Sequence, residues 1–325
     1  MTTMAKARIL VTRHLPPEVE SRLERDFAAS LNITDRIMST AEIAEKAKAF
    51  DGLLVTSMDQ CRKELIDALP ASIRMIATFS VGTDHIDIPA AKGKGIAVAN
   101  TPDVLTDATA DIALLLMLGA ARGAIWGDRM VRENKWLPPS ITFPLGHDVS
   151  GRRLGIYGMG RIGQAVAKRA AAFGMTLHYH NRKPVAADLS HGATYHKTLD
   201  SMLPHCDFLS VNCASTAETR DSVNARSIGL LPPGAIVVNS ARGDIVNDEA
   251  LIAALKSGKL AAAGLDVFKG EPNINPAYRE LENVFMLPHL GSATKNTRIA
   301  MGMRAVDNLA AFFKGERPRD LLTGA

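Results

Sequence analysis

GIYGMGRIGQAVAKRAAAFGMTLHYHNRK, residues 155–183, is the stretch of this chain that decides its fold. An apolar strand over residues 154–157 leads into a glycine turn, and apolar residues then recur at helical spacing from Ile162 to Phe173. Gly174 ends this helix, and a second strand over residues 176–180 follows directly. A strand, a helix and a further strand in this order predict a β-α-β unit of a parallel sheet.

The glycine turn, Gly158-Met159-Gly160-Arg161-Ile162-Gly163, has the spacing G-x-G-x-x-G. Gly158 permits the tight turn, Gly160 lets a pyrophosphate approach the backbone, and Gly163 lets the helix pack close to the strand. The diphosphate would then lie at the positive end of the helix. The same spacing occurs in ordinary turns, but here the strands and the helix stand where a dinucleotide site requires them. We therefore interpret the turn as a dinucleotide-binding motif.

The end of the second strand bears on the choice of dinucleotide. A carboxylate about 20 residues past the glycines binds the ribose 2′-hydroxyl of NAD, but this chain has Asn181-Arg182-Lys183 there. Asn181 has no charge to repel a 2′-phosphate, and Arg182 and Lys183 can form charge-assisted contacts with one. The sequence therefore favours NADP, with NAD as the second choice. The alternative is that the two basic residues form no more than a solvated turn.

The composition of the chain narrows the class of protein. A length of 325 residues with 46% hydrophobic residues suits about two domains with cores of their own. A net charge of +4, from basic residues scattered along the chain, does not suggest nucleic-acid binding. Cys61, Cys206 and Cys213 lack C-x-x-C spacing, which argues against a metal site and suits a reducing cytoplasm. The longest apolar run, residues 112–121, is too short to span a membrane.

Short strands alternate with helices along most of the chain, which indicates parallel sheets. Residues 1–100 are expected to form a smaller, flavodoxin-like α/β domain, and residues 101–288 a doubly wound parallel sheet of the Rossmann type. The last helix, over residues 294–313, is expected to return to the first domain, which then also includes residues 289–325. A nearly all-apolar helix over residues 104–122 must be covered on most faces, as it would be between domains or at a subunit interface. The expected strands cover residues 7–12, 52–56, 74–78, 95–99, 154–157, 176–180, 208–212, 235–239, 261–265 and 284–286.

Three titratable residues, Arg242, Glu271 and His289, each follow one of the last three expected strands. Because ligands bind at the carboxyl ends of strands in such sheets, we expect the three to face one site. Taken singly, each has an ordinary explanation: a surface ion pair, a solvated carboxylate or a core histidine. Taken together, beside a dinucleotide motif, they predict a catalytic set.

This set suits hydride transfer to a 2-keto acid. Arg242 can make a bidentate contact with the carboxylate and carbonyl oxygens and polarise the carbonyl. His289 can donate the proton that the new alkoxide requires. Glu271, if it is close, would favour the protonated imidazole and fix its tautomer.

Several motifs carry a resemblance to a known family. They are the glycine turn, Val238-Asn239-Ser240-Ala241-Arg242-Gly243, Gly264-Leu265-Asp266-Val267-Phe268 with Glu271-Pro272, and Pro288-His289. Through them the chain resembles the D-isomer-specific 2-hydroxyacid dehydrogenases over most of residues 75–310. Within that family it is similar to the glyoxylate and hydroxypyruvate reductases, partly through Ser80-Val81-Gly82-Thr83-Asp84-His85-Ile86-Asp87.

The resemblance implies roles for further residues. The backbone N–H groups of Val81 and Gly82 would bind the substrate carboxylate, and Asp266 would hold the nicotinamide carboxamide. It also implies a homodimer formed through the dinucleotide domains, with Trp136 or Phe143 reaching the partner's site. The implied cofactor set is Gly158, Gly160, Arg161, Ile162, Gly163, Asn181, Arg182, Lys183, Thr109, Cys213, Ala241, Asp266 and Ser292, with Arg161 and Ile162 along the pyrophosphate, Thr109 and Ala241 near the nicotinamide, and Ser292 near His289. The implied substrate set is Val81, Gly82, Arg242 and His289.

The expected reaction is the reduction of glyoxylate or hydroxypyruvate, with 2-ketogluconate as a larger candidate, to the D-2-hydroxy acid by NADPH. Asn181 departs from the aspartate of many family members, which puts NAD in doubt but not the reaction. Formate dehydrogenases lack the glutamate present here as Glu271, and phosphite dehydrogenases place a lysine in the loop that here reads Ala77-Thr78-Phe79-Ser80, so neither fits. A dinucleotide-sensing, corepressor-like binding protein would keep the fold, but it would bind NADPH or NADH with little turnover.

Overall fold

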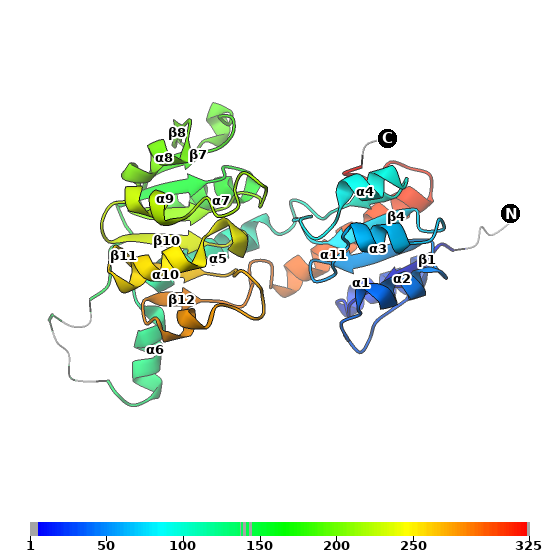
Figure 1. Ribbon diagram of the computed structural model, residues 1–325, viewed down its shortest axis with the longest axis horizontal. Helices are drawn as coiled ribbons and strands as arrows, with labels where there is room; N and C mark the ends of the chain where they lie inside the picture. Colours follow the sequence, from blue (N-terminus) through cyan, green and yellow to red (C-terminus); the bar gives the residue numbers. More distant parts are fainter. Residues whose placement is uncertain (1–5, 137, 139–140, 143–144, 324–325) are drawn as a thin grey trace. The chain divides into compact units, whose positions relative to one another are not determined.

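The chain folds into two compact units. The structure, a computed structural model, describes residues 6–136, 138, 141–142 and 145–323. Unit 1 comprises Met1–Leu105 with Thr294–Ala325, and unit 2 comprises Thr106–Ala293 (Figure 1). Both boundaries lie a few residues later than those expected from the sequence. The segment after residue 100 stays in unit 1 because the Thr101 N–H donates to the Ser80 carbonyl and Asp103 pairs with Arg304.

Unit 1 is built on a five-stranded parallel sheet in the order β2-β1-β3-β4-β5. This is the flavodoxin-like order, so the predicted fold class is confirmed. The strands are β1 (Arg8–Val11), β2 (Ala28–Ser30), β3 (Gly52–Thr56), β4 (Met75–Phe79) and β5 (Ala97–Ala99). One face carries α1 (Pro17–Asp26) and α11 (Lys295–Phe313), and the other carries α2 (Thr40–Ala47), α3 (Lys63–Ala68) and α4 (Ile88–Gly93).

The last helix, α11, packs against β4 and α1, as expected for a segment that returns to the first domain. A glycine makes this packing close: a Cβ atom added at Gly302 would lie 2.5 Å from Val19 Cγ2 and 3.1 Å from the Phe79 ring. Local signals set the beginnings of other helices in unit 1. The Ser39 hydroxyl accepts from the Glu42 N–H in a capping box that starts α2.

Unit 2 is built on a seven-stranded parallel sheet in the order β12-β11-β10-β9-β6-β7-β8. The strands are β6 (Arg153–Tyr157), β7 (Thr176–His180), β8 (Thr194–His196), β9 (Phe208–Val211), β10 (Ala235–Asn239), β11 (Leu260–Leu265) and β12 (Val284–Met286). The chain runs outward from β6 to β8, then crosses over to β9 and continues the other way. This doubly wound topology confirms the predicted class and puts a switch point between β6 and β9, where such sheets bind ligands.

Helices cover both faces of the sheet in unit 2. They are α5 (Thr106–Ala121) and α7 (Arg161–Ala171) on one face, and α8 (Leu199–Met202), α9 (Ala225–Leu230) and α10 (Asp248–Lys256) on the other. Short 3-10 helices are η1 (Ala187–Leu189), η2 (Leu203–His205), η3 (Gly243–Ile245) and η4 (Pro276–Glu280). Two strands in the chain, β2 and β8, and the helix α4 are not in the sequence prediction. The two strands, Ala28–Ser30 and Thr194–His196, contain no branched aliphatic residue, and α4 contains Pro89 and Gly93, so none of the three stands out from a loop in the sequence.

The apolar helix expected over residues 104–122 is α5, and it packs against α7, β10 and β11. The core of unit 2 therefore supplies most of its cover, although the Leu115 side chain is 45% exposed. The next helix, α6 (Ala124–Arg132), projects from unit 2 and has no buried residue (Figure 1). No single helix of the described residues is long and apolar enough to cross a membrane; α5 and α6 together reach the length and composition but are bent by 68°.

Candidate active site

Three neighbouring strands of unit 2 bring the predicted catalytic residues to one edge of the sheet. Arg242 follows β10, Glu271 follows β11 and His289 follows β12, and these strands are adjacent in the sheet. His289 Nδ1 and Glu271 Oε2 are 2.8 Å apart. Because an ionised carboxylate only accepts, Nδ1 carries the hydrogen of this bond. The Nε2 atom is therefore the imidazole nitrogen that remains for a ligand.

Besides the His289 side chain, the Glu271 carboxylate has a second partner, which is a backbone N–H group. Its Oε1 atom accepts a hydrogen bond of 2.6 Å from the Phe268 N–H. Burial alone would raise the pKa of Glu271, but the hydrogen bonds from His289 and Phe268 and the charge of Arg242 together hold that pKa below its ordinary value. Glu271 is therefore ionised at neutral pH, and Arg242 is near enough for its charge to act on it.

Asp266, at the end of β11, holds the turn that carries His289. Its side chain is fully buried, and its two carboxylate oxygens accept from the Leu290 N–H at 2.6 Å and the Gly291 N–H at 2.8 Å. Its backbone carbonyl also accepts from the His289 N–H at 2.9 Å. Burial, the largest influence, raises the pKa of Asp266 despite these donors. Each carboxylate oxygen has a further lone pair, so the predicted contact with a carboxamide is compatible with the clamp.

His289 itself has a left-handed backbone, with φ at +56°. A histidine in this region costs about 1–3 kcal/mol unless the surroundings enforce it. Here the Asp266 bonds to Leu290 and Gly291 and the Glu271 bond to the imidazole enforce it. Strain of this kind is concentrated at functional sites. We therefore interpret the strained turn as a means of orienting the His289 imidazole, since a connection between two elements would not by itself require this conformation.

A close approach of two loops ties Arg242 to the Glu271 side of the site. A Cβ atom at Gly243 would lie 1.9 Å from the Phe268 carbonyl carbon, so only glycine fits there. The Asn239 side chain holds the other side of the loop, because its oxygen accepts from the Ala241 N–H at 3.0 Å and its nitrogen donates to the Arg242 carbonyl at 2.8 Å. The half-buried Arg242 guanidinium donates to the Ala241 carbonyl at 2.8 Å.

Two further predicted residues border the His289 turn. Thr109, buried in α5, donates its hydroxyl hydrogen to the Gly291 carbonyl at 3.0 Å. Ser292 is half-buried and follows Gly291 directly. The structure thus brings Thr109, Asp266 and Ser292 to the same edge as the pair of Glu271 and His289.

The glycine motif has the geometry that a dinucleotide requires. Gly158 has φ at +101°, and a Cβ atom there would lie 2.4 Å from the Cys213 nitrogen at the end of β9. A Cβ atom at Gly163 would lie 2.2 Å from the Gly158 carbonyl oxygen. At Gly160, by contrast, a Cβ atom would meet no described atom within 4 Å. The chain itself therefore explains the first and third glycines, whereas the middle one leaves room for a ligand.

The first turn of α7 supplies donors beside that room. Gly160 is the N-cap residue, and no side chain caps the helix. The N–H groups of the first turn therefore remain for an anion, and the helix dipole favours one there. Arg161 is exposed and Ile162 half-buried at this end of the helix. These residues fit the diphosphate of a nicotinamide dinucleotide.

The three cysteines, Cys61, Cys206 and Cys213, are free thiols. Cys213, beside Gly158, is in the predicted cofactor set, and burial raises its pKa to about 12. Burial likewise raises the pKa of Cys61 and of Cys206 to about 12. Cys213 therefore contributes a neutral wall to the site rather than a nucleophile. Among the described residues no group of three His, Cys, Asp or Glu side chains could hold a metal ion.

The turn after β7 places Asn181 next to β8, whose Tyr195 hydroxyl donates to the Asn181 carbonyl at 3.3 Å. Arg182 and Lys183 are exposed. The sequence did not reveal that Arg182 has an acidic neighbour: the pKa of Glu218 is lowered, mainly by the Thr216 hydroxyl and to a lesser extent by the Arg182 charge. Glu218 lies in the loop after β9, so sequence distance hid it.

Val81 and Gly82 belong to unit 1, where they follow β4 at the carboxyl edge of its sheet. Both are half-buried, and within the described part of the chain no protein acceptor takes the Val81 N–H or the Gly82 N–H. Half-buried amide groups without a protein acceptor are suited to a ligand. Of the two aromatic residues predicted to reach a partner, Trp136 is 71% exposed, and Phe143 lies outside the described residues.

Comparison with known proteins identifies the family. A model of the "D-isomer specific 2-hydroxyacid dehydrogenase, NAD binding domain" matches residues 114–291, within unit 2. The chain belongs to this family. It is 45% identical to the glycerate dehydrogenase of Hyphomicrobium methylovorum, over 96% of this chain and 98% of that one. It is 39% identical to the glyoxylate reductase of Thermococcus litoralis, over 98% of this chain and 97% of that one.

A solved structure gives the same result. The NADPH-dependent glyoxylate/hydroxypyruvate reductase of Sinorhizobium meliloti, in complex with NADP and malonate, matches with a TM-score of 0.89 and 37% identity, over 98% of this chain and 97% of that one. This D-2-hydroxyacid dehydrogenase is therefore an enzyme of the glyoxylate/hydroxypyruvate reductase branch, with a nicotinamide dinucleotide and a small 2-keto acid as its reactants. The alternative of a sensing protein without turnover is set aside.

Several residues of the dehydrogenase site are absent from the sequence prediction. Asn239 and Gly243 stand inside a motif that the sequence analysis quoted, yet their contacts with Arg242 and Phe268 depend on two loops meeting. The Phe268 N–H is a backbone donor, and because almost every residue has a backbone N–H, the sequence cannot reveal which one bonds Glu271. In unit 1, Ser80 and Asn100 bond the Gly82 and Val81 carbonyls from different segments.

Replacing Glu271 with Gln should lower the stability of this dehydrogenase in a pH-dependent way. The folded state holds the pKa of Glu271 below its ordinary value of 4.5. The carboxylate therefore contributes stability that is complete above about pH 4.5 and is lost as the pH falls through the lowered folded-state pKa. Urea unfolding of both proteins between about pH 7 and pH 3.5 should show a difference in free energy that narrows toward acid. The matched control is Glu280→Gln, at an exposed carboxyl of the same unit. A free-energy difference for Glu271→Gln that stays constant with pH would contradict the assigned stabilisation of the ionised Glu271 carboxylate.

Proposed function

We propose that this enzyme reduces glyoxylate or hydroxypyruvate to the D-2-hydroxy acid with NADPH, with 2-ketogluconate as a larger candidate substrate. Unit 2 would be the cofactor domain and unit 1 the substrate domain. The observation that carries the proposal is the pair of His289 and Glu271, 2.8 Å apart, with Arg242 on the neighbouring strand. An acid, its partner and a cation at the carboxyl edge of a dinucleotide-binding sheet are what reduction of a keto acid requires.

Each residue of the triad has a separate chemical task in the proposal. The Arg242 guanidinium binds oxygens of the keto acid and stabilises the charge that develops on the carbonyl oxygen. His289 donates a proton from Nε2 to that oxygen. Glu271 holds the imidazole through Nδ1 and stabilises its charged form. Val81 and Gly82 bind the substrate carboxylate through their N–H groups.

The residues proposed for the cofactor lie along the switch point of unit 2. Gly158, Gly160 and Gly163 with the first turn of α7 would hold the diphosphate, and Arg161, Ile162 and Cys213 would line it. Thr109, Ala241, Asp266 and Ser292 would surround the nicotinamide, which when bound supplies the hydride. The chain's part in this step is to hold the dinucleotide and to exclude water from it.

The preference for NADPH rests on the turn after β7. Asn181 has no carboxylate with which to repel a 2′-phosphate, and Arg182 and Lys183 are exposed cations. The Sinorhizobium meliloti relative is named as NADPH-dependent and was solved with NADP.

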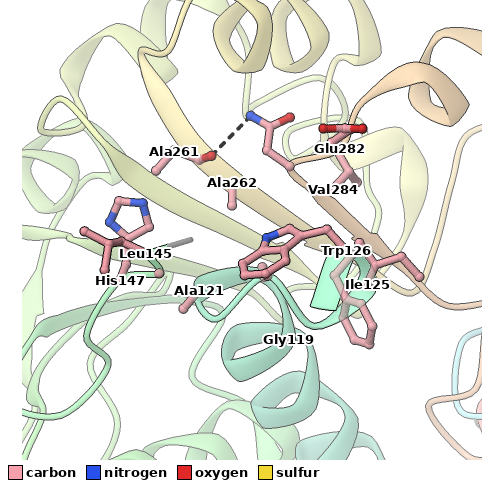
Figure 2. A pocket seen from close by; sticks show the side chains of 15 residues that line it. Gly119, Ala121, Ile125, Trp126, Leu145, His147, Ala261, Ala262, Glu282 and Val284 are labelled. Carbon is pink, nitrogen blue, oxygen red and sulfur yellow. Dashed lines mark hydrogen bonds between the residues drawn. The ribbon is translucent and has the colours of Figure 1, made fainter. Parts of the chain in front are cut away.

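A homodimer through unit 2 is supported by an uncovered apolar surface. The helix α6 has no buried residue, although it contains Ile125, Trp126, Met130 and Val131, and Val131 is 60% exposed. Beside it, a pocket of about 220 Å³ is lined by α5, α6, the strands β11 and β12 and residues 145–147 (Figure 2). Its lining includes the small residues Gly119 and Ala262 and the larger side chains of Trp126 and Leu145. We propose that a second copy of the chain fills the pocket and covers the apolar side chains of α6, since such side chains are unfavourable in water when left uncovered.

Replacing His289 with Asn should lower kcat for glyoxylate by about 100-fold or more, because general acid catalysis contributes about that much. The asparagine can still donate to Glu271 and tolerates the left-handed backbone, so NADPH affinity should stay unchanged. His191→Asn is the matched control, because His191 is exposed in the same unit and has φ at +51°. NADPH and NADH oxidation with glyoxylate, hydroxypyruvate, pyruvate and 2-ketogluconate provides the measurement. Wild-type activity in His289→Asn would remove His289 from the mechanism, and no turnover by the wild type would overturn the proposed substrates.

Replacing Arg182 with Ala should lower the preference for NADPH over NADH by about tenfold or more, since a charge-assisted hydrogen bond contributes about 1.5–3 kcal/mol. The ratio of kcat/KM for the two cofactors measures it. The control is Arg226→Ala, because Arg226 is an exposed arginine of unit 2 that pairs with Asp200. If both variants keep the wild-type ratio, Arg182 does not bind the 2′-phosphate.

Replacing Val131 with Glu should convert the dimer into a monomer, because the new charge would have to be buried in the apolar interface. Sedimentation equilibrium of wild type and variant gives the mass directly. Ile33→Glu, at a side chain that is 72% exposed in unit 1, should leave the dimer intact. A monomeric wild-type protein would refute the dimer, and a dimeric Val131→Glu variant would exclude α6 from the interface.

A further inference from the structure

We propose that Asn100 and Ser80 are positioning residues that hold the backbone turn at Val81 and Gly82 so that its N–H groups face the substrate carboxylate. The proposal rests on the proposed function, in which this turn binds a 2-keto acid. In this proposal the turn is held by the Asn100 side chain from a separate segment, by the Ser80 hydroxyl at its own start, and by a buried hydrogen-bond relay from His85 and Thr78 to Ser80.

Three consecutive carbonyl groups of the turn are tied back to the protein. The Ser80 carbonyl accepts from the Thr101 N–H at 2.9 Å, and the Val81 carbonyl accepts from Asn100 Nδ2 at 2.8 Å. The Gly82 carbonyl accepts from the Ser80 hydroxyl at 2.7 Å. No protein acceptor in the described ranges takes the N–H groups of Val81 and Gly82. The three carbonyl groups of the turn are thus bonded within the protein, whereas the N–H groups of Val81 and Gly82 remain for a ligand.

The planarity of the peptide bond converts these ties into directions. In a trans peptide the C=O of one residue and the N–H of the next point in opposite directions. Holding the Ser80 carbonyl therefore aims the Val81 N–H, and holding the Val81 carbonyl aims the Gly82 N–H. The Ser80 hydroxyl, bonded to the Gly82 carbonyl, instead fixes the next peptide group and so closes the turn. Both carbonyls bond the same segment, residues 100–101, so both N–H groups point away from it. Successive N–H groups directed to one side form an anion-binding nest.

The bonds behind Ser80 run in one direction only. Because a carbonyl oxygen can only accept, the Ser80 hydroxyl donates its one hydrogen to the Gly82 carbonyl. The Thr78 hydroxyl, 2.8 Å from the Ser80 hydroxyl, must then be the donor of that pair. Thr78 in turn accepts from His85 Nε2 at 3.0 Å, which therefore carries a hydrogen. Thr78, Ser80 and His85 are all buried, so the relay is shielded from water, which would otherwise compete for these bonds.

Asn100 is held by the returning segment of unit 1. Its backbone carbonyl accepts from Asn308 Nδ2 at 3.1 Å. The Asn308 oxygen accepts from the Asp320 N–H at 3.2 Å, and Asp320 pairs with Arg304 at 2.6 Å. The Arg304 and Asp320 side chains are nearly buried, so this support is rigid. A chain of hydrogen bonds therefore connects Asp320, after the end of α11, through Asn308 and Asn100 to the turn at Val81 and Gly82.

The test compares wild type with Asn100→Asp, Ser80→Ala and Ser80→Thr. An ionised Asp at position 100 keeps the shape but donates nothing to the Val81 carbonyl. We expect Asn100→Asp and Ser80→Ala to raise KM for glyoxylate and Ki for oxalate by about threefold to tenfold, since one hydrogen bond is worth about 0.5–1.5 kcal/mol. Ser80→Thr, which keeps the hydroxyl, should restore both values. NADPH affinity, a property of unit 2, should not change in any variant.

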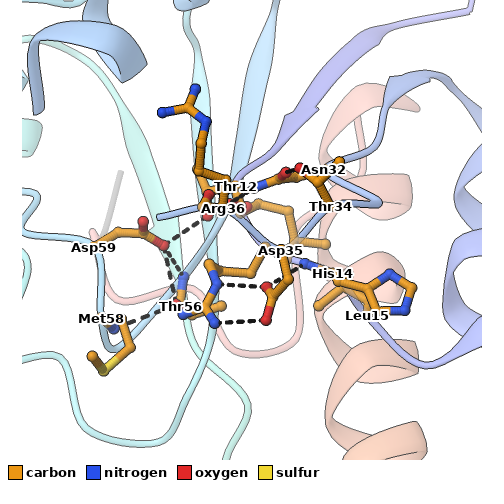
Figure 3. Close-up of polar contacts among 12 residues, drawn as sticks. Thr12, His14, Leu15, Asn32, Thr34, Asp35, Arg36, Thr56, Met58 and Asp59 are labelled. Carbon is orange, nitrogen blue, oxygen red and sulfur yellow. Dashed lines mark hydrogen bonds and ion pairs between the residues drawn. The ribbon is translucent and has the colours of Figure 1, made fainter. Parts of the chain in front are cut away.

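Asn32→Ala is the matched control for a merely structural loss. Asn32 is a buried amide of the same unit, and its Nδ2 donates to the Thr12 carbonyl at 2.7 Å and the Arg36 carbonyl at 2.8 Å (Figure 3). The Asn32→Ala variant should have a lower Tm but wild-type values of KM for glyoxylate and Ki for oxalate.

The proposal is overturned if Asn100→Asp and Ser80→Ala lower Tm as Asn32→Ala does and leave KM and the oxalate Ki at wild-type values. Wild-type protein without turnover of any 2-keto acid would instead refute the proposed function. In that case the change in oxalate affinity, measured by calorimetry on the same variants, still decides whether Asn100 and Ser80 aim an anion site. An unchanged affinity would overturn the proposal.

Discussion

The buried carboxylate of Asp266 is the interaction on which the candidate active site depends. It accepts from the N–H groups of Leu290 and Gly291 and so closes the turn after β12 against the end of β11. Burying an ionised carboxylate costs several kcal/mol, and hydrogen bonds to a charged group contribute about 1.5–3 kcal/mol each. The clamp is therefore a device for holding geometry rather than a large net source of stability. It keeps His289 in its left-handed conformation beside Glu271.

Close backbone approaches are the second constraint on the site. The loop after β10 touches the loop after β11 at Gly243 and Phe268, and the loop after β9 touches the glycine turn at Cys213 and Gly158. Any side chain at these glycines would push the loops apart. Arg242 is thereby kept beside Glu271, and the end of β9 forms one wall of the dinucleotide site. In unit 1 the backbone is held by side chains instead of close glycine contacts: Ser80 and Asn100 donate hydrogen bonds to the Gly82 and Val81 carbonyls.

Much of this protein could be predicted from its residues because the signals are local. Periods of apolar residues marked strands such as 176–180, 235–239 and 284–286 with the bounds that the structure has. The glycine spacing and the motifs around Arg242, Glu271 and His289 led to the family, which the comparisons show. The short elements β2, β8 and α4 escaped prediction because β2 and β8 have no branched aliphatic side chain and α4 contains Pro89 and Gly93. The helix α5 was expected at an interface, but the core of its own unit covers most of it.

The sequence by itself determined the fold class, the dinucleotide motif and the identity of the residues that line the sheet edge, because spacing along the chain carries that information. Only the tertiary structure decided which atoms meet. The 2.8 Å contact of His289 with Glu271, the bonds accepted by the two Asp266 oxygens, and the bond from Asn100 to the Val81 carbonyl all join residues from separate segments. Such contacts depend on how strands are ordered in a sheet and how loops cross at its edge, and no local pattern encodes the direction of a single hydrogen bond.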